Sequence, residues 1–149
     1  MNEIRFRFFV DKDCNWFQDS KPITHKRIYN FNYQNLKRDE QGLFYVEENN
    51  SRAYVNFEDK PYIVKSIDIS EDNRILLNLN DFSCESLNID TLIFKENIPY
   101  CTVKNGKYEA KFSRPALHQI AKAITSKNGS YYINSQIIKY PWTEAHQST

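Results

Sequence analysis

The chain has 149 residues, with 20 Lys and Arg against 19 Asp and Glu, so its formal net charge is +1. A globular chain of this length buries roughly 70% of the surface that its unfolded form exposes, which is enough for a hydrophobic core. The near-neutral balance supplies no broad field to concentrate nucleic acid or anionic lipid at the surface. We therefore expect no membrane association, and nucleic acid is an unlikely partner.

The cysteines and the N-terminal residues indicate the compartment. Cys14, Cys84 and Cys101 are odd in number and lack the paired spacing of a zinc site, which argues against a disulfide framework and a metal site. We expect them to be buried small side chains. Residues 1–10 alternate charged and aromatic side chains, unlike a signal peptide, and no run reaches the length of a membrane span. The sequence predicts a soluble, cytoplasmic protein.

The first half of the chain predicts strands around one helix. Residues 4–8 alternate at period two, and a turn at residues 11–15 leads back into Trp16-Phe17 as a hairpin. Ser20 can cap a helix that includes Pro22, because the first N–H groups of a helix have no internal acceptor. This helix is expected to reach about Leu36. Further strands are predicted at residues 43–47, 52–58 and 62–69.

The second half predicts the same kinds of element. Strands are expected at residues 74–79, 87–89, 91–95, 100–104 and 107–112. Asn105-Gly106 predicts a hairpin between the last two, because a type I′ turn needs positive φ at both central positions. Ser113-Arg114-Pro115 opens a second helix to about Thr125, which Asn128-Gly129 is expected to end. Strands at residues 130–133 and 136–140 follow.

Two similar helix starts indicate an internal duplication. Ser20-Lys21-Pro22 and Ser113-Arg114-Pro115 share a Ser-basic-Pro pattern, and each follows a short aromatic strand. The predicted fold class is therefore α+β, a duplicated unit of antiparallel strands plus one helix. The expected division is residues 1–76 as the N-terminal repeat, 77–142 as the C-terminal repeat and 143–149 as a flexible tail.

The order of several short motifs resembles a known family. These motifs are residues 11–16, Pro22-Ile23, residues 37–42 and residues 58–62, with Ser113-Arg114-Pro115 and residues 129–132 in the second half. In order and spacing they resemble the bacterial domain of unknown function 1285 family over nearly the whole chain. The chain departs at Cys14 and Ser20, where the family usually has glycine, and at Glu47-Glu48, where it usually has Thr-Pro.

The resemblance implies a duplicated α+β architecture whose second half is superficially similar to pleckstrin-homology folds. It implies no established activity. It suggests a nucleotide-like ligand between the two repeats and a role in signalling.

The helix starts are the candidate anion sites. Unpaired N–H groups and a partial positive charge favour an anion at a helix N-terminus, although an ordinary Ser cap without a ligand explains the same pattern. His25 falls within the apolar arc of the first helix, where a histidine in the core is the alternative. Residues 25–27 and Lys37-Arg38 could form a basic strip of the kind that binds single-stranded nucleic acid, but Asp39-Glu40 and the near-neutral total charge favour a solvated face. The candidate ligand-binding residues are Ser113, Arg114, His118, Lys21, His25 and Arg27.

No phosphate-loop, dinucleotide or metalloprotease motif occurs, and the cysteines lack the glycine elbow and Cys–His–Asn order of thiol hydrolases. We therefore expect no catalytic residue, no cofactor and no metal. The predicted function is a non-enzymatic module that binds a small anionic, nucleotide-like ligand between its repeats in bacterial signalling. The alternative is a protein–protein interaction scaffold without a small-molecule ligand.

Overall fold

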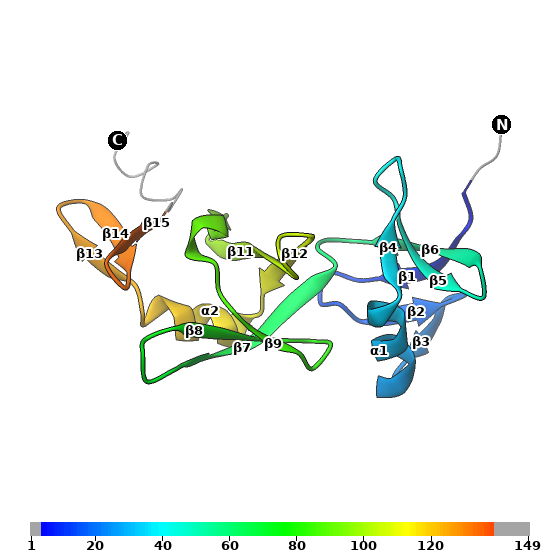
Figure 1. Cartoon of the computed structure of the whole chain (residues 1–149), viewed down its shortest axis with the longest axis horizontal. Helices are drawn as coiled ribbons and strands as arrows, with labels where there is room; N and C mark the ends of the chain where they lie inside the picture. The colour runs from blue at the N-terminus through cyan, green and yellow to red at the C-terminus, as the bar shows by residue number, and fades with distance from the viewer. Residues whose placement is uncertain (1–3, 139–149) are drawn as a thin grey trace. The chain divides into compact units, whose positions relative to one another are not determined.

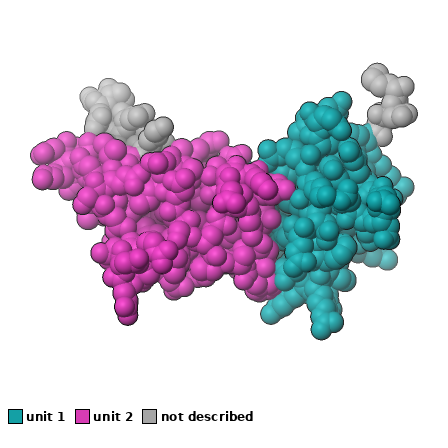
Figure 2. All heavy atoms as spheres, in the orientation of Figure 1, with its two compact units in different colours: residues 1–61 teal, residues 62–149 magenta. Residues whose placement is uncertain are grey.

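The computed structural model describes residues 4–138 (Figure 1). The chain divides into two compact units, residues 1–61 and residues 62–149, which Figure 2 draws in different colours. Each unit holds one six-stranded sheet, and the second unit adds a small three-stranded sheet. In the described part of the chain, no helix has the length and apolar character needed to cross a membrane.

Unit 1 is a mixed sheet with one helix. Its elements are β1 (Phe6–Val10), β2 (Trp16–Gln18), β3 (Lys21–Ile23), α1 (Lys26–Gln34), β4 (Leu36–Arg38), β5 (Phe44–Glu48) and β6 (Ser51–Phe57). The strand order is β3-β2-β1-β6-β5-β4. Neighbouring strands are antiparallel except the central pair, β1 and β6, which run parallel.

The two faces of this sheet differ. Phe8 and Val10 are buried on one face together with Trp16, whose ring packs edge-on against Phe8 and against Tyr33 of α1, at centroid distances of 5.7 and 5.1 Å. Helix α1 therefore covers this face. Phe9 stands one position away in the strand and points to the opposite face, because side chains alternate along a strand. The hairpin predicted for this region is confirmed. The alternation predicted at residues 4–8 is wrong, because a β-bulge between Phe6 and Phe8 interrupts it, and burial alternates only from Phe8 to Val10.

Unit 2 contains the remaining elements. They are β7 (Tyr62–Ile69), β8 (Ile75–Leu79), β9 (Cys84–Ser86), the 3-10 helix η1 (Ile89–Thr91), β10 (Ile93–Lys95), β11 (Ile98–Val103), β12 (Tyr108–Phe112), α2 (Arg114–Ala121), β13 (Thr125–Lys127), β14 (Ser130–Ile133) and β15 (Gln136–Ile138). The large sheet has the order β10-β11-β12-β7-β8-β9, and its central pair, β12 and β7, is parallel. Strands β13, β14 and β15 form the small sheet.

The two large sheets have the same topology. Each consists of two three-stranded meanders, and the first strand of the first meander pairs in parallel with the last strand of the second. The duplicated α+β unit is thus confirmed, with the correction that each sheet is mixed and not wholly antiparallel. The helices are not equivalent, because α1 joins the two meanders of unit 1 whereas α2 follows the last strand of unit 2.

The predicted start of the first helix is wrong. Asp19 and Ser20 have φ values of 49° and 70° and form the turn between β2 and β3. Pro22 lies in β3, an edge strand that pairs with β2, where a missing N–H donor is tolerated. Helix α1 begins at Lys26, and His25 is its exposed N-cap, with Nδ1 accepting a hydrogen bond from the Arg27 N–H at 3.2 Å. His25 is therefore outside the apolar arc in which it was expected.

Two departures from the family pattern coincide with unusual backbone geometry. At Cys14 and Ser20 the resemblance implies glycine, and the φ values of these two residues are 62° and 70°. L-residues rarely adopt this left-handed region, whereas glycine enters it without a steric penalty. The turn geometry is thus one that glycine fits, even though this chain has side chains at both positions.

Of the two Asn-Gly predictions in unit 2, the hairpin is confirmed and the helix end is wrong. Asn105 and Gly106 have φ values of 59° and 80° in the β11–β12 hairpin, as predicted. Asn128 and Gly129, with φ values of 54° and 82°, lie between β13 and β14, so they form a hairpin turn and do not end the helix, which stops at Ala121. Residues 87–89 are not a strand, because the Asn88 side chain accepts a hydrogen bond from the Asp90 N–H and caps η1.

The division between the units lies between Pro61 and Tyr62, before the predicted join at residues 76 and 77. Strand β7 pairs with β8 and with β12, so it belongs to the second sheet. A boundary after residue 76 would cut through β8 and separate β7 from β12. The predicted tail, residues 143–149, and the end of the last predicted strand lie outside the described residues.

Candidate functional site

Three of the sequence-predicted ligand residues lie at helix α2. The Ser113 hydroxyl accepts a hydrogen bond from the Ala116 N–H at 3.3 Å and donates one to the Lys65 carbonyl at 3.0 Å. Arg114 is the first residue of the helix, and His118 lies one turn later on the same side, with both side chains exposed. Ser113 is therefore a helix cap, as the sequence predicts.

The other three predicted residues belong to unit 1. Lys21 and His25 line one open hollow of about 430 Å³, together with Ile28. Arg27 is exposed on α1 and is not among the residues that line this hollow. The structure thus groups Lys21 with His25 and Arg114 with His118, and a single site that unites all six residues stays a prediction.

A larger site occupies the face of the unit 1 sheet that α1 does not cover. Two hollows, of about 600 and 540 Å³, adjoin there, and both are lined by Arg5, Arg7 and Asp19. We call the first the phenylalanine hollow, because Phe6, Phe9 and Phe17 also line it. We call the second the Arg52 hollow, because Arg52 and Tyr54 line it with the β5–β6 turn. Together, Arg5, Phe6, Arg7, Phe9, Phe17 and Arg52 are named the Arg–Phe face.

Strand pairing positions these side chains. Phe9 lies opposite Phe17 on β2 and opposite Asn56 on β6. A β-bulge between Phe6 and Phe8 makes Arg7 an additional residue in β1, because Phe6 pairs with Tyr54 and Phe8 with the next residue of β6. A bulge changes the direction of a side chain, and here Arg7 lines both hollows of the exposed face.

Two arginines of this face have no carboxylate partner. Within residues 4–138 no ion pair joins Arg5 or Arg7 to Asp or Glu. Arg7 contacts Gln18, whose amide oxygen, when it faces the guanidinium, accepts from Nε and Nη2 at 3.3 and 2.9 Å. A guanidinium keeps its charge at any physiological pH and donates in a planar fork that matches carboxylate and phosphate groups.

Arg52 is held more firmly than the other two arginines. Its guanidinium lies 4.6 Å from the centre of the Tyr45 ring, and it reaches Glu40 at 3.6 Å. A hydrogen bond with Tyr54, together with the field of Tyr45, raises the pKa of Arg52 above its ordinary value. Arg52 therefore lies over the Tyr45 ring and has Glu40 as its carboxylate partner.

The phenylalanines add an apolar surface to the same face. Phe6 is 43% exposed and Phe9 is 38% exposed, although both are large hydrophobic side chains. Phe9 contacts Phe17 at a centroid distance of 6.1 Å with an interplanar angle of 37°. Exposed rings next to arginines that have no carboxylate partner in the described part of the chain provide a stacking surface and an anion-binding group within one site.

Sequence reasoning missed this face. The alternation of arginine and phenylalanine at residues 4–8 was visible, but it indicated only a half-buried strand. Arg52 is far from β1 in the sequence and reaches the same site because β6 pairs with β1. Only the three-dimensional pairing could reveal that these residues share one surface.

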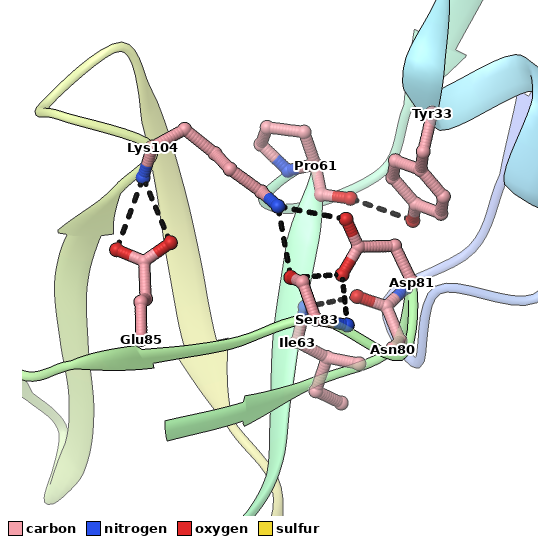
Figure 3. A network of polar contacts seen from close by, with 8 residues as sticks. All are labelled: Tyr33, Pro61, Ile63, Asn80, Asp81, Ser83, Glu85 and Lys104. Carbon is pink, nitrogen blue, oxygen red and sulfur yellow. Dashed lines mark hydrogen bonds and ion pairs between the residues drawn. The ribbon is translucent and has the colours of Figure 1, made fainter. Parts of the chain in front are cut away.

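Unit 2 contains a different polar cluster, shown in Figure 3. Lys104 Nζ donates to Asp81 Oδ2 and to Ser83 Oγ, both at 2.8 Å, and the Lys104 backbone N–H reaches the Glu85 carboxylate at 3.2 and 3.1 Å. Burial raises the pKa of Asp81, but hydrogen bonds from Lys104 and Ser83 outweigh it, so the pKa lies below the ordinary value. Because Lys104 lies in the β11–β12 turn and Asp81 and Ser83 lie in the turn after β8, this cluster cross-links the two turns.

Figure 3 also shows two bonds that fix local backbone. The Tyr33 hydroxyl of α1 donates to the Pro61 carbonyl at 2.8 Å within unit 1. In unit 2 the Ile63 N–H donates to Asn80 Oδ1 at 3.1 Å. Both hydrogen bonds therefore hold a backbone group in place.

The cysteines and potential metal ligands form no further site among residues 4–138. All three cysteines are free, and Cys101 alone is buried. The expectation that all three are buried is therefore wrong for Cys84, which is exposed, and for Cys14, which is half-buried. Burial raises the pKa of the Cys101 thiol to about 12. No three His, Cys, Asp or Glu side chains within this range gather closely enough to hold a metal ion.

The class of protein that the fold defines is a duplicated α+β protein with two six-stranded mixed sheets. No protein-family model and no curated protein matches the sequence. The structure is similar to that of a DUF1285 family protein from Silicibacter pomeroyi DSS-3, with a TM-score of 0.74 and 14% identity, covering 91% of this chain and 79% of that one.

A second similar structure is that of a DUF1285 family protein from Shewanella baltica OS155. The TM-score is 0.66 and the identity 10%, and the match covers 78% of this chain and 91% of that one. The resemblance to this family is therefore confirmed at the level of the fold, which is all that identities this low can show. The likeness of the second half to pleckstrin-homology folds stays a prediction.

Proposed function

We propose that the protein is a non-enzymatic module that binds a small anionic, nucleotide-like ligand on the Arg–Phe face of unit 1. One observation carries the proposal. Arg5 and Arg7, which have no carboxylate partner within the described residues, lie where two hollows meet beside exposed phenylalanine rings. A role in bacterial signalling, in the cytoplasm, is part of the proposal and rests on the family resemblance.

The chemistry of the face supports this ligand class. A phosphate or carboxylate can accept hydrogen bonds from the two guanidinium forks, and such charge-assisted bonds are about twice as strong as neutral ones. A planar ring can stack on Phe9, which contributes on the order of 1–3 kcal/mol for a nucleic-acid base on an aromatic side chain. Asp19 and Glu48 also line the hollows, so they favour a ligand with hydroxyl or amino donors and few negative charges.

Thermal unfolding with added anions tests the proposal. A ligand that binds only the folded state raises the melting temperature as its concentration rises. We expect adenosine monophosphate, guanosine monophosphate or inorganic pyrophosphate to produce this rise. The double variant Arg5→Gln with Arg7→Gln should abolish it without lowering the melting temperature of the unliganded protein by more than a few degrees.

Arg114→Gln is the matched control, because Arg114 is also exposed and was the arginine that the sequence favoured. The rise should persist in this variant. If Arg114→Gln abolishes the rise and the Arg5, Arg7 variant keeps it, the anion binds at the start of α2 and the proposed face is wrong.

A protein-interaction scaffold is the second candidate, and α1 provides the observation that favours it. Ile28 and Phe31 of this helix are 48% and 46% exposed. Exposed apolar side chains on one helix are a feature of docking surfaces. The scaffold takes first place if none of the three anions shifts the melting temperature.

A further inference from the structure

The position of the arginines within the Arg–Phe face indicates the shape of its ligand. Arg5 and Arg7 line both the phenylalanine hollow and the Arg52 hollow, so the positive charge lies at the junction of the two. An anionic group held there leaves one hollow on each side. We infer, on the basis of the proposed function, that the ligand is elongated, with a central phosphate linkage and a ring at each end, as in a dinucleotide.

Each hollow is lined by a planar group that does not line the other. In the phenylalanine hollow this planar group is formed by Phe9 and Phe17. In the Arg52 hollow it is formed by the Arg52 guanidinium, which rests on the Tyr45 ring and whose side chain is 44% exposed. A guanidinium plane stacks on aromatic rings as well as donating hydrogen bonds. Two separate rings can therefore be held, each by a different chemistry.

The sizes of the hollows agree with two binding subsites. Their volumes, about 600 and 540 Å³, each fall within the range of a pocket that holds one drug-sized ligand. A mononucleotide can occupy only one of them while its phosphate is at the junction. A molecule with two nucleosides can occupy both hollows at once. Its second ring is already held next to the second hollow when the first ring binds, which raises the overall affinity.

The charges limit how anionic the linkage is. Arg5, Arg7 and Arg52 supply the positive charges, and Asp19 and Glu48 line the same hollows. Arg52 is also paired with Glu40, so within residues 4–138 only Arg5 and Arg7 of these three lack a carboxylate partner, and a diester or a bridging pyrophosphate fits better than a triphosphate chain. Asp19, which lines both hollows, can accept a hydrogen bond from a ribose hydroxyl on either side of the linkage.

Isothermal titration calorimetry on the full chain tests the inference with matched probes. These are adenosine monophosphate, inorganic pyrophosphate and diadenosine pyrophosphate, together with the corresponding guanosine compounds. Of the adenosine and guanosine dinucleotides, we expect the one with the higher affinity to bind at least tenfold more tightly than the mononucleotide with the same base. Arg52→Gln and Phe9→Leu should each weaken the dinucleotide at least threefold. Each should weaken the mononucleotide less than the dinucleotide, because a mononucleotide can still occupy the unaltered hollow.

The substitutions are chosen to separate binding from folding. Phe9→Leu keeps an apolar side chain but removes the ring, and Arg52→Gln keeps a long polar side chain but removes the guanidinium. Arg114→Gln, outside the face, should leave every affinity unchanged. Melting temperatures of the unliganded variants identify any that lose stability, and Arg52→Lys, which keeps the charge without the plane, replaces Arg52→Gln if that variant unfolds.

The outcomes separate a failure of the inference from a failure of the proposed function. Equal affinities for the dinucleotide and the mononucleotide, or an unchanged dinucleotide affinity in both subsite variants, overturn the two-ring ligand. The proposed function survives that result if pyrophosphate or mononucleotide binding is still lost in the Arg5→Gln, Arg7→Gln variant. If none of the probes binds, both are wrong.

Discussion

Lys104 shows how one side chain can join two turns of unit 2. Its ammonium group binds Asp81 and Ser83, which follow β8, while its own backbone lies in the β11–β12 hairpin. The Asp81 side chain is only 12% exposed, so the lysine neutralises a largely buried carboxylate. Removing one partner of such a pair leaves the other charge without compensation.

The lowered pKa of Asp81 predicts an acid-dependent loss of stability. A carboxyl group whose folded pKa lies below its unfolded value, 3.8 in the reference state, stabilises the fold above that value. This contribution is lost as the pH falls through the folded pKa. We expect Asp81→Asn to lower the free energy of unfolding by about 1–2 kcal/mol at pH 7.

Urea unfolding at pH 7 and near pH 3 measures this effect. The difference between Asp81→Asn and the natural sequence should narrow at the lower pH, because the natural carboxyl is then becoming protonated. Asp13→Asn, at an exposed carboxyl, should change the free energy by less than about 0.5 kcal/mol at either pH. If the difference in free energy of unfolding between Asp81→Asn and the natural sequence does not change with pH, the ion pair is not its cause.

At the scale of elements, the two Ser-basic-Pro stretches have opposite structures. Ser113 caps α2 through its hydroxyl, whereas Ser20 occupies a left-handed position in the turn before β3. The local pattern is the same, but Pro22 lies in an edge strand that pairs with β2. Strand pairing therefore overrides a favourable helix-start pattern in unit 1.

Alanine substitutions at the two serines test this difference. Ser113→Ala removes the cap and the bond to the Lys65 carbonyl, so we expect it to lower the free energy of unfolding by about 1–2 kcal/mol. Ser20→Ala should change it by less than about 0.5 kcal/mol, because alanine also has a Cβ and no cap is lost. Chemical denaturation of both variants provides the comparison. Equal losses would mean that Ser20 caps a helix after all.

At the scale of the whole molecule, the duplication lies in the sheets. Both units build a six-stranded sheet from two meanders joined by a parallel central pair, although their helices occupy different positions in the chain. Each parallel pair links the first and last strands of one six-stranded sheet, so that sheet is complete only when the chain from its first strand to its last is present. The unit boundary is therefore decided by which strands pair.

Fragments test the boundary. A chain of residues 62–149 keeps β7 between β8 and β12, whereas residues 77–149 lack it. We expect the longer fragment to unfold cooperatively on heating and the shorter one to show no cooperative transition, because its sheet lacks a central strand. Circular dichroism with temperature measures both. Cooperative unfolding of residues 77–149 would favour the predicted boundary at residues 76 and 77.

The sequence alone determined the features that depend on neighbouring residues. The Asn105-Gly106 hairpin, the β1–β2 hairpin and the Ser113 cap were all predicted correctly. Their physical causes are positive φ at a turn, turn-forming residues between two strands and a side-chain acceptor at a helix start. Each of these acts within a few residues, so a pattern in the sequence is sufficient.

Only the tertiary structure decided which distant strands pair, and the candidate site depends on this. The β1–β6 pair brings Arg52 to the face that carries Arg5 and Arg7, and the β7–β12 pair places β7 in unit 2. Such pairings depend on how much apolar surface the whole sheet buries and not on a local preference. Turn chemistry could therefore be predicted residue by residue, whereas the binding face required the folded chain.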